Sequence, residues 1–133
     1  MEPNFDNGQY LVINEIGYRL GEPLRSDVIV FRYPLDPSQY YIKRIVGLPG
    51  ETIEIKEGRI FINDSILDES IYLSEEVMTQ GGIRVELSEG EYFVLGDNRK
   101  ASSDSRQWGA LPRENIIGQV WIRAWPFDTA KIY

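Results

Sequence analysis

The sequence predicts one domain of mainly β structure, with antiparallel sheets in a curled or barrel-like arrangement and a small inserted flap. Runs of β-branched and aromatic residues recur between clusters of Gly, Pro, Asn, Asp and Ser, which is typical of strands and turns. Apolar residues at helical spacing are rare, and the 133 residues suit a single domain with its own core. Strands are expected over residues 10–13, 28–31, 40–46, 92–95 and 120–125.

The clearest local unit is a β-hairpin formed by residues 52–56 and 59–63. A two-residue Glu-Gly turn joins the two strands, and this loop length fixes their register. The expected cross-strand pairs are Ile55 with Ile60 and Ile53 with Ile62. The four isoleucines then share one face of the hairpin, which a slip of one residue would destroy.

The connections between strands carry less pattern. Residues 36–39 and 112–115 could each form a single turn. Residues 64–88 have acidic pairs and a Gly-Gly pair but no clear period, so we expect a small insertion there between two regular strands. No repeats or low-complexity tracts divide the chain, and residues 1–133 are expected to form one domain.

The composition excludes several classes of chemistry. The chain contains no histidine and no cysteine, so it can form no Ser-His-Asp triad, imidazole or thiolate metal site, thiol nucleophile or disulfide. Proton transfer must use Lys, Asp, Glu, Tyr or the backbone. The net charge of -7 argues against a general nucleic-acid binder. No apolar stretch approaches the length of a membrane-spanning helix, so the chain as given is expected to be soluble.

Lys43 is the first candidate for catalysis. Strand alternation over residues 40–46 places Lys43 and Arg44 on opposite faces, so one of these adjacent cations must have apolar neighbours. A lysine desolvated in this way has a lowered pKa and can accept a proton near neutral pH. The alternative is that both cations solubilise an edge strand, and the spacing by itself favours this alternative.

A dense polar run over residues 96–106 is the second candidate. It follows an expected strand and contains two aspartates, two arginines and three serines. Such a run can be a solvated loop, or a scaffold in which Asp-Arg pairs fix a loop and a serine hydroxyl orients a catalytic group. The composition does not choose between the two.

The tryptophans Trp108, Trp121 and Trp125 lie in the last quarter of the chain. Packing in the core is the default interpretation, and contact with a membrane interface is the alternative.

In order along the chain, these residues resemble bacterial type I signal peptidase (leader peptidase), a family of serine proteases with a Ser-Lys dyad. Residues 41–50 resemble the box that holds the general-base lysine of the family. Residues 96–106 resemble the box Gly-Asp-Asn-x-x-x-Ser-x-Asp-Ser-Arg. Residues 1–4 resemble a Met-x-Pro-Thr stretch, with Asn4 in place of the threonine. The resemblance runs over essentially the full chain.

The resemblance implies an endopeptidase that cleaves N-terminal signal peptides from exported preproteins after Ala-x-Ala-like sites. Lys43 would be the neutral general base, and Ser102 would hold its amine in line. The loop that carries Ser102 would be braced by Asp97, Asn98, Arg99, Asp104 and Arg106. Shallow apolar pockets for the substrate would be lined by Met1, Phe5, Tyr41 and Ile42. No metal or cofactor is implied.

The resemblance also implies partners and a location. The partners would be the signal peptides of secreted preproteins and, for the full-length parent, the membrane, with no role for nucleic acid. The parent would lie in the cell membrane with its catalytic domain on the extracytoplasmic side. The nucleophilic serine of the family would stand immediately before Met1, and none of the nine serines occupies that position. We therefore expect this chain to be a fragment that lacks the anchor and the nucleophile and is itself inactive.

Two other functions are compatible with the sequence. A Ser-Lys autoprotease of the SOS-repressor type has a related fold but needs a cleavable linker and a DNA-binding module. A non-catalytic peptide-binding β domain would leave Lys43 with an ordinary pKa, and the substitution Lys43→Met would then be silent.

Overall fold

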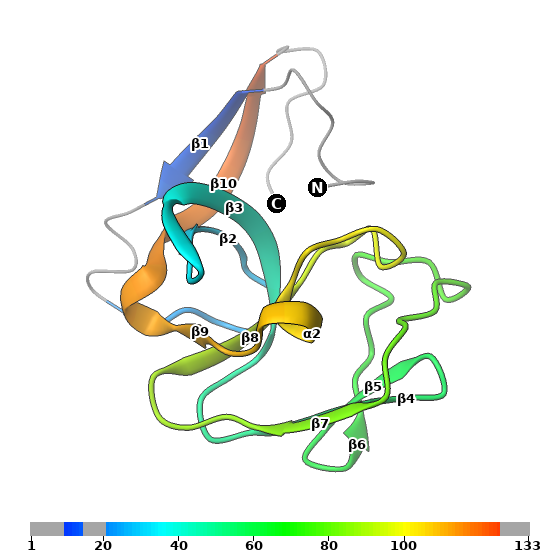
Figure 1. Ribbon diagram of the computed structural model, residues 1–133. Helices are drawn as coiled ribbons and strands as arrows, with labels where there is room; N and C mark the ends of the chain where they lie inside the picture. The colour runs from blue at the N-terminus through cyan, green and yellow to red at the C-terminus, as the bar shows by residue number, and fades with distance from the viewer. Residues whose placement is uncertain (1–9, 15–20, 126–133) are drawn as a thin grey trace.

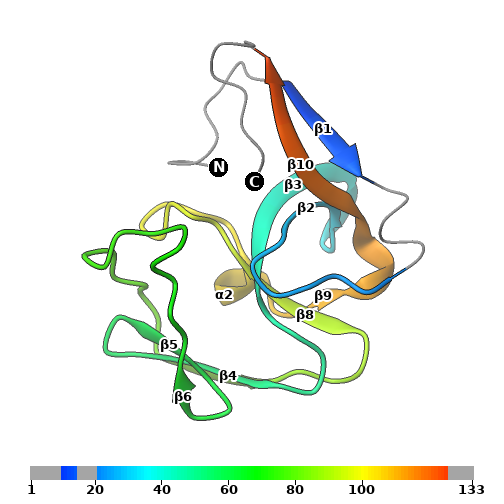
Figure 2. The ribbon, with the colours of Figure 1, turned by 180° about the vertical axis from the view of Figure 1, so that it is seen from behind.

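The computed structural model describes residues 10–14 and 21–125 of the chain, with side chains over residues 21–120. This part of the chain is mainly β, as predicted, and forms two antiparallel sheets with two short helical turns (Figures 1 and 2). Both sheets are open, so the barrel-like alternative gives way to two separate sheets.

The larger sheet has six strands in the order β1-β10-β2-β3-β8-β9. Their bounds are β1 Tyr10–Asn14, β10 Ile116–Trp125, β2 Val28–Tyr33, β3 Asp36–Gly47, β8 Glu91–Leu95 and β9 Leu111–Pro112. The smaller sheet has four strands in the order β6-β5-β4-β7, which are β6 Ser65–Ile66, β5 Arg59–Ile62, β4 Thr52–Lys56 and β7 Ile83–Glu86. Each strand predicted from the sequence is present.

The predicted hairpin is confirmed as β4 and β5, with both expected isoleucine pairs in register. Glu57 and Gly58 at its tip have φ angles of 53° and 75°, so both lie in the left-handed region. Two successive left-handed residues are the signature of a type I′ turn, whose twist matches that of the flanking strands.

Three connecting segments differ in how well the sequence predicted them. The single turn expected at 36–39 is wrong, because Asp36 pairs with Tyr33 and already belongs to β3. Residues 112–115 do form a turn, the 3-10 helix η1 over Arg113–Asn115. Residues 64–88 contain β6 and β7, which extend the smaller sheet on both sides of the hairpin.

Three clusters of buried residues form the core. The first lies on the face of the larger sheet that also carries Tyr41, and comprises Ile29, Phe31, Ile45, Tyr92, Val94, Leu111 and Ile116. The second joins the two sheets and comprises Val46, Ile53, Ile55, Ile60, Leu87, Phe93 and Leu95. The third lies on the opposite face of the larger sheet and comprises Val28, Val30 and Val120.

The chain between β8 and β9 lies where the two sheets meet. It contains a loop over residues 96–104 and the short helix α2, Ser105–Trp108. Both views place α2 beside β8, between the larger and the smaller sheet (Figures 1 and 2). Among the described residues, no helix has the length and apolar character needed to cross a membrane.

Candidate active site

Lys43 lies on β3, an interior strand that is hydrogen-bonded to β2 on one side and to β8 on the other. The interpretation of Lys43 as a charge on an edge strand is therefore wrong. Lys43 pairs with Ile29 on the neighbouring strand β2. It shares its side of the sheet with Ile45, which is fully buried. Its Nζ donates a hydrogen bond of 3.0 Å to Oγ of Ser102. The two residues are 59 positions apart in the chain, and the fold brings them into direct contact.

The surroundings of Lys43 change its basicity. Burial lowers the pKa of its amine below the ordinary lysine value, because a cation loses hydration there. The carboxylates of Asp104 and Asp97 act in the opposite direction, while the guanidinium of Arg106 lowers the pKa further. Burial is the largest of these effects, so the net direction is downward. The amine is thus shifted toward the neutral form that can accept a proton.

The backbone at Gly96 closes one side of this pair. A Cβ atom at Gly96 would overlap Oγ of Ser102 and would lie 3.4 Å from Nζ of Lys43. The N–H of Gly96 donates to Oδ2 of Asp104 at 3.1 Å, and its carbonyl accepts from Nε of Arg99 at 2.8 Å. Gly96 is therefore fixed from both sides at the point where only a glycine fits.

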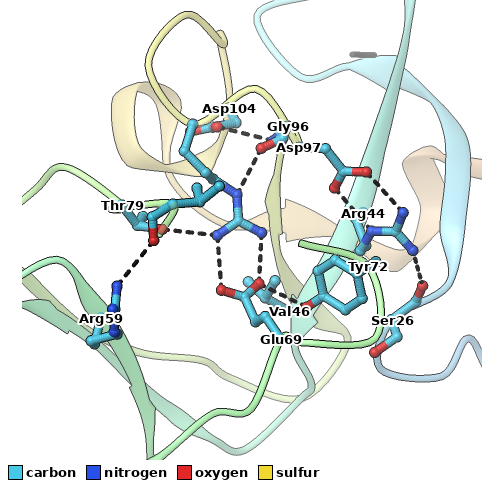
Figure 3. A network of polar contacts seen from close by, with 12 residues as sticks. Ser26, Arg44, Val46, Arg59, Glu69, Tyr72, Thr79, Gly96, Asp97 and Asp104 are labelled. Carbon is cyan, nitrogen blue, oxygen red and sulfur yellow. Dashed lines mark hydrogen bonds and ion pairs between the residues drawn. The ribbon is translucent and has the colours of Figure 1, made fainter. Parts of the chain in front are cut away.

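Arg44, the neighbour of Lys43, is also removed from water, which the sequence had predicted for one of the two cations only. Its guanidinium makes two hydrogen bonds to Asp97, with Nε to Oδ1 at 2.9 Å and Nη2 to Oδ2 at 2.8 Å. A third bond of 3.0 Å runs to the carbonyl of Ser26. Arg44 is 6% exposed and Asp97 is 2% exposed, so this is a buried ion pair (Figure 3).

A second buried pair joins Asp104 and Arg106. Nε and Nη2 of Arg106 each contact a different oxygen of the Asp104 carboxylate at 2.9 Å. Nη1 of Arg106 donates to the carbonyl of Arg99 at 2.9 Å, which closes the loop onto itself. Most charged side chains of the polar run over residues 96–106 are therefore hydrogen-bonded within the protein, and these bonds hold the loop in place. Asn98 differs, because its side chain is exposed.

Asp104 also caps α2, which the sequence analysis missed. Its side chain accepts from the backbone N–H of Arg106, and the side chain of Gln107 accepts in return from the N–H of Asp104. This capping box has a sequence signature, a short polar residue followed three positions later by Gln or Glu, so it could have been found. Ser105, which was also missed as an anchor, accepts from the N–H of Val94 at 2.9 Å and ties the helix to β8.

The two described residues that are expected to contact substrate, Tyr41 and Ile42, lie on opposite faces of the larger sheet. Tyr41 lies on the face of Lys43 and stacks on Tyr33 with ring centroids 4.5 Å apart. Trp108 completes this aromatic group by contact with Phe31 and Tyr33, in agreement with the core interpretation of that tryptophan. Ile42 packs on the opposite face. Met1 and Phe5 lie outside the described residues, as do the side chains of Trp121 and Trp125.

Three further residues in contact with this loop and with Arg44 were not predicted from the sequence: Glu69, Tyr72 and Thr79, which belong to the segment between β6 and β7. Glu69 forms an ion pair with Arg99, Thr79 accepts a hydrogen bond from the same guanidinium, and the ring of Tyr72 lies against Arg44. No periodic signal marks these residues, because their partners lie far along the chain. Within the described part of the chain, no group of three or more acidic side chains is arranged to hold a metal ion.

Known proteins of one family are similar to this chain in sequence and in fold. A family model described as signal peptidase, peptidase S26, matches residues 1–125. The crystal structure of a signal peptidase I from Enterococcus faecalis matches with a TM-score of 0.64 at 32% identity, over 75% of this chain and 97% of that chain. The fold is thus that of a signal peptidase I.

Two curated relatives are similar over nearly the whole chain. The probable signal peptidase I-2 of Synechocystis sp. is 37% identical over 132 residues, or 95% of this chain and 59% of that protein. The signal peptidase I of Leptolyngbya laminosa is 39% identical over 136 residues, or 96% of this chain and 66% of that protein. The chain therefore spans less than two thirds of the length of each of these relatives. It belongs to the signal peptidase family, peptidase S26.

Proposed function

We propose that this chain is the catalytic domain of a serine endopeptidase that cleaves N-terminal signal peptides from exported preproteins. The observation that carries the proposal is the Lys43 amine, half-buried on an interior strand and hydrogen-bonded at 3.0 Å to Ser102. Buried lysines with a lowered pKa are rare outside functional sites, and a neutral amine can act as the general base for peptide-bond cleavage in a chain that has no histidine.

In this mechanism the neutral Lys43 amine accepts the proton of a serine hydroxyl as its oxygen attacks the scissile carbonyl. The resulting ammonium gives that proton to the departing amine of the mature protein, and an acyl-enzyme remains. Lys43 then takes a proton from the water whose oxygen attacks the ester, and its ammonium returns a proton to the serine oxygen as the signal peptide is released. Ser102 holds the amine in line, and the scaffold of Asp97, Arg99, Asp104 and Arg106 holds Ser102. Asn98, whose side chain is exposed, is proposed as a weaker contributor.

The substrate would bind as an extended strand beside the lysine, with small side chains before the cleavage site selected by shallow apolar pockets. Tyr41 is proposed to line such a pocket, because its ring lies on the face of Lys43. Ile42, Met1 and Phe5 are proposed as further pocket residues on the strength of the family resemblance. No cofactor is required for this chemistry.

Members of this family are associated with membranes. We propose that the active protein works at the cell membrane with this domain on the extracytoplasmic side. Signal peptides and the membrane would be its partners, and nucleic acid would not be one. The net charge of -7 supports the last point, since a polyanion is repelled by an acidic domain.

The test uses the chain extended by a Gly-x-Ser sequence ahead of Met1, because the resemblance gives the nucleophile that position. The extended chain is expected to cleave a preprotein with an Ala-x-Ala site, and its Lys43→Ala variant is expected to lose activity by several orders of magnitude. The same chain with alanine instead of the added serine is the matched control and should be inactive.

A non-catalytic peptide-binding domain predicts a different result. In that case the extended chain and its Lys43→Ala variant would bind a signal peptide equally well and neither would cleave it. This outcome would overturn the proposed function.

A further inference from the structure

Arg99 is the most enclosed cation in the loop that carries Ser102. Its side chain is 0% exposed, and four hydrogen bonds hold its guanidinium in place. Nε donates to the carbonyl of Gly96 at 2.8 Å, and Nη1 donates to Oγ1 of Thr79 at 2.9 Å. The remaining two bonds run to the carboxylate of Glu69, at 3.0 Å from Nη1 and 2.6 Å from Nη2.

Glu69 supplies the carboxylate that pairs with this buried cation. It comes from the segment between β6 and β7, which the chain reaches only after leaving the lysine strand. A buried guanidinium that loses its paired carboxylate is strongly destabilised and turns toward water. The placement of Arg99 therefore depends on a residue outside its own loop.

Arg99 in turn holds the carbonyl of Gly96, whose backbone lies against Ser102 and Lys43. The N–H of Gly96 is held by Asp104 from within the loop. The position of the Gly96 carbonyl therefore depends on the position of the Arg99 guanidinium. A shift of Gly96 would change the alignment of the Ser102 hydroxyl with the Lys43 amine, because the Gly96 backbone leaves no room for a Cβ atom beside Ser102 and the hydroxyl lies 3.0 Å from the amine.

The same segment reaches the other side of the site through Tyr72. Its hydroxyl donates to Oε2 of Glu69 at 2.7 Å, and its ring centroid lies 4.1 Å from the guanidinium carbon of Arg44. Arg44 pairs with Asp97, the residue after Gly96. Figure 3 shows Glu69 and Tyr72 side by side, facing the ion pair of Arg44 and Asp97 on one side, with Thr79 on the other.

We propose that Glu69 is a positioning residue for the lysine site, which acts through Arg99 and the Gly96 carbonyl to hold Ser102 in line with Lys43. The segment between β6 and β7 is then a clamp on the catalytic loop rather than a passive insertion. The catalytic consequence of this inference rests on the proposed function, but the geometric consequence does not.

The variant Glu69→Gln keeps the size of the side chain and removes its charge. With Arg99 released, Gly96 loosens, water reaches the amine, and the pKa of Lys43 rises toward the ordinary lysine value. A purely electrostatic effect has the opposite sign, because loss of a negative charge disfavours the lysine cation. The charged groups that surround Lys43 itself, namely Asp97, Asp104 and Arg106, remain unchanged in this variant.

The experiment compares the chain with its Glu69→Gln variant and with Glu76→Gln, a matched control at an exposed carboxylate of the same segment. The first readout is the titration of the Lys43 amine by NMR of chains with carbon-13 at the lysine ε position, which is practical because the chain has only four lysines. The second readout is preprotein cleavage by the serine-extended forms. Glu69→Gln is expected to lower kcat on the order of 100-fold with KM unchanged, and Glu76→Gln is expected to match the parent chain in both readouts.

Should Glu69→Gln fail to fold, Tyr72→Phe is the second variant, since it keeps the ring on Arg44 and removes only the hydroxyl bond to Glu69. It is expected to shift both readouts in the same direction by a smaller amount. If kcat and the Lys43 titration in Glu69→Gln, or in Tyr72→Phe in its place, equal those of Glu76→Gln, or if the pKa falls, the inference is wrong. If the serine-extended parent is no more active than its Lys43→Ala variant, the proposed function fails, and the titration alone then decides whether Glu69 positions the lysine.

Discussion

At Gly96 the backbone of the loop that carries Ser102 comes closer to the Ser102 side chain than any residue with a Cβ atom would allow. The geometry of the site therefore depends on the absence of a Cβ atom at Gly96 as well as on the amine and the hydroxyl. The amine, the hydroxyl and the glycine backbone form a compact unit in which each limits the movement of the others. Small substitutions here should affect catalysis more than folding.

The first prediction concerns Gly96→Ala in the serine-extended chain. The added methyl group would overlap Oγ of Ser102, so the hydroxyl must rotate away from Nζ of Lys43. We expect kcat to fall on the order of 100-fold, measured by cleavage of an Ala-x-Ala preprotein.

Gly82→Ala is the matched control, because a Cβ atom at Gly82 meets no atom within 4 Å. It should retain the kcat of the parent. Equal activity of Gly96→Ala and Gly82→Ala would mean that the contact between Gly96 and Ser102 has no catalytic importance.

Among the elements, α2 illustrates how one carboxylate can serve several purposes. Asp104 caps the helix, pairs with Arg106 and holds the N–H of Gly96. A four-residue helix has little stability of its own, so its position is set by these contacts.

The second prediction is that Asp104→Ala lowers the free energy of unfolding by about 3–5 kcal/mol, because it leaves the Arg106 cation without its buried partner. Urea denaturation followed by tryptophan fluorescence measures the change. Glu89→Ala removes an exposed carboxylate and should stay within about 0.5 kcal/mol of the parent. Indistinguishable unfolding midpoints for the two variants would contradict the role assigned to Asp104.

The elements that the sequence predicted are those whose pattern is local. The hairpin of β4 and β5 was predictable in register, because a two-residue turn and four alternating isoleucines leave one solution. The strands β6 and β7 were not, since β6 has only two residues and β7 alternates half-buried with exposed side chains. The turn expected at 36–39 was wrong because Asp36 and Pro37 suggest a turn locally, while pairing with β2 extends β3 through them.

The site was predictable to a different degree. Alternation correctly indicated that one of Lys43 and Arg44 must be shielded from water. The structure half-buries Lys43 and fully buries Arg44, and the burial of Arg44 depends on Asp97, which lies 53 positions further along the chain. The contact of Lys43 with Ser102 was expected from family resemblance alone, because no periodicity links two residues so far apart. The contribution of Glu69 had no signal at all, since it depends on where an irregular segment packs.

In the whole molecule, the two sheets share a core rather than merely touching. Val46, Phe93 and Leu95 of the larger sheet pack with Ile53 and Ile55 of the smaller one. This shared cluster fixes the smaller sheet against the larger one, and with it the segment that contacts the loop carrying Ser102. We therefore expect both sheets to unfold together.

The third prediction tests this junction at Gly47, the last residue of β3. A Cβ atom there would lie 2.6 Å from Cδ1 of Ile53 and 2.9 Å from Cβ of Phe93, one in each sheet. We expect Gly47→Ala to destabilise the protein by about 1–3 kcal/mol while keeping a single unfolding transition. Calorimetry measures both quantities, with Gly82→Ala as the unstrained control. Two separate transitions in the parent chain would contradict the shared core.

The fold lowers the pKa of Lys43, which favours the neutral amine that the proposed function requires as a base. Its pKa is lowered in the folded state, so between that pKa and the ordinary lysine value the unfolded chain binds more protons. Stability contributed by this group therefore rises with pH across that window, and the active neutral amine accumulates as pH rises through the folded pKa.

The most direct test is an NMR titration of the Lys43 amine in chain labelled with carbon-13 at the lysine ε positions, performed on the folded protein and again in urea. We expect Lys43 to titrate at a clearly lower pH in the folded protein than in the unfolded chain, and Ser102→Ala to alter the titration of the folded protein. Equal titration of Lys43 in the folded and unfolded states would show that the fold does not tune this amine.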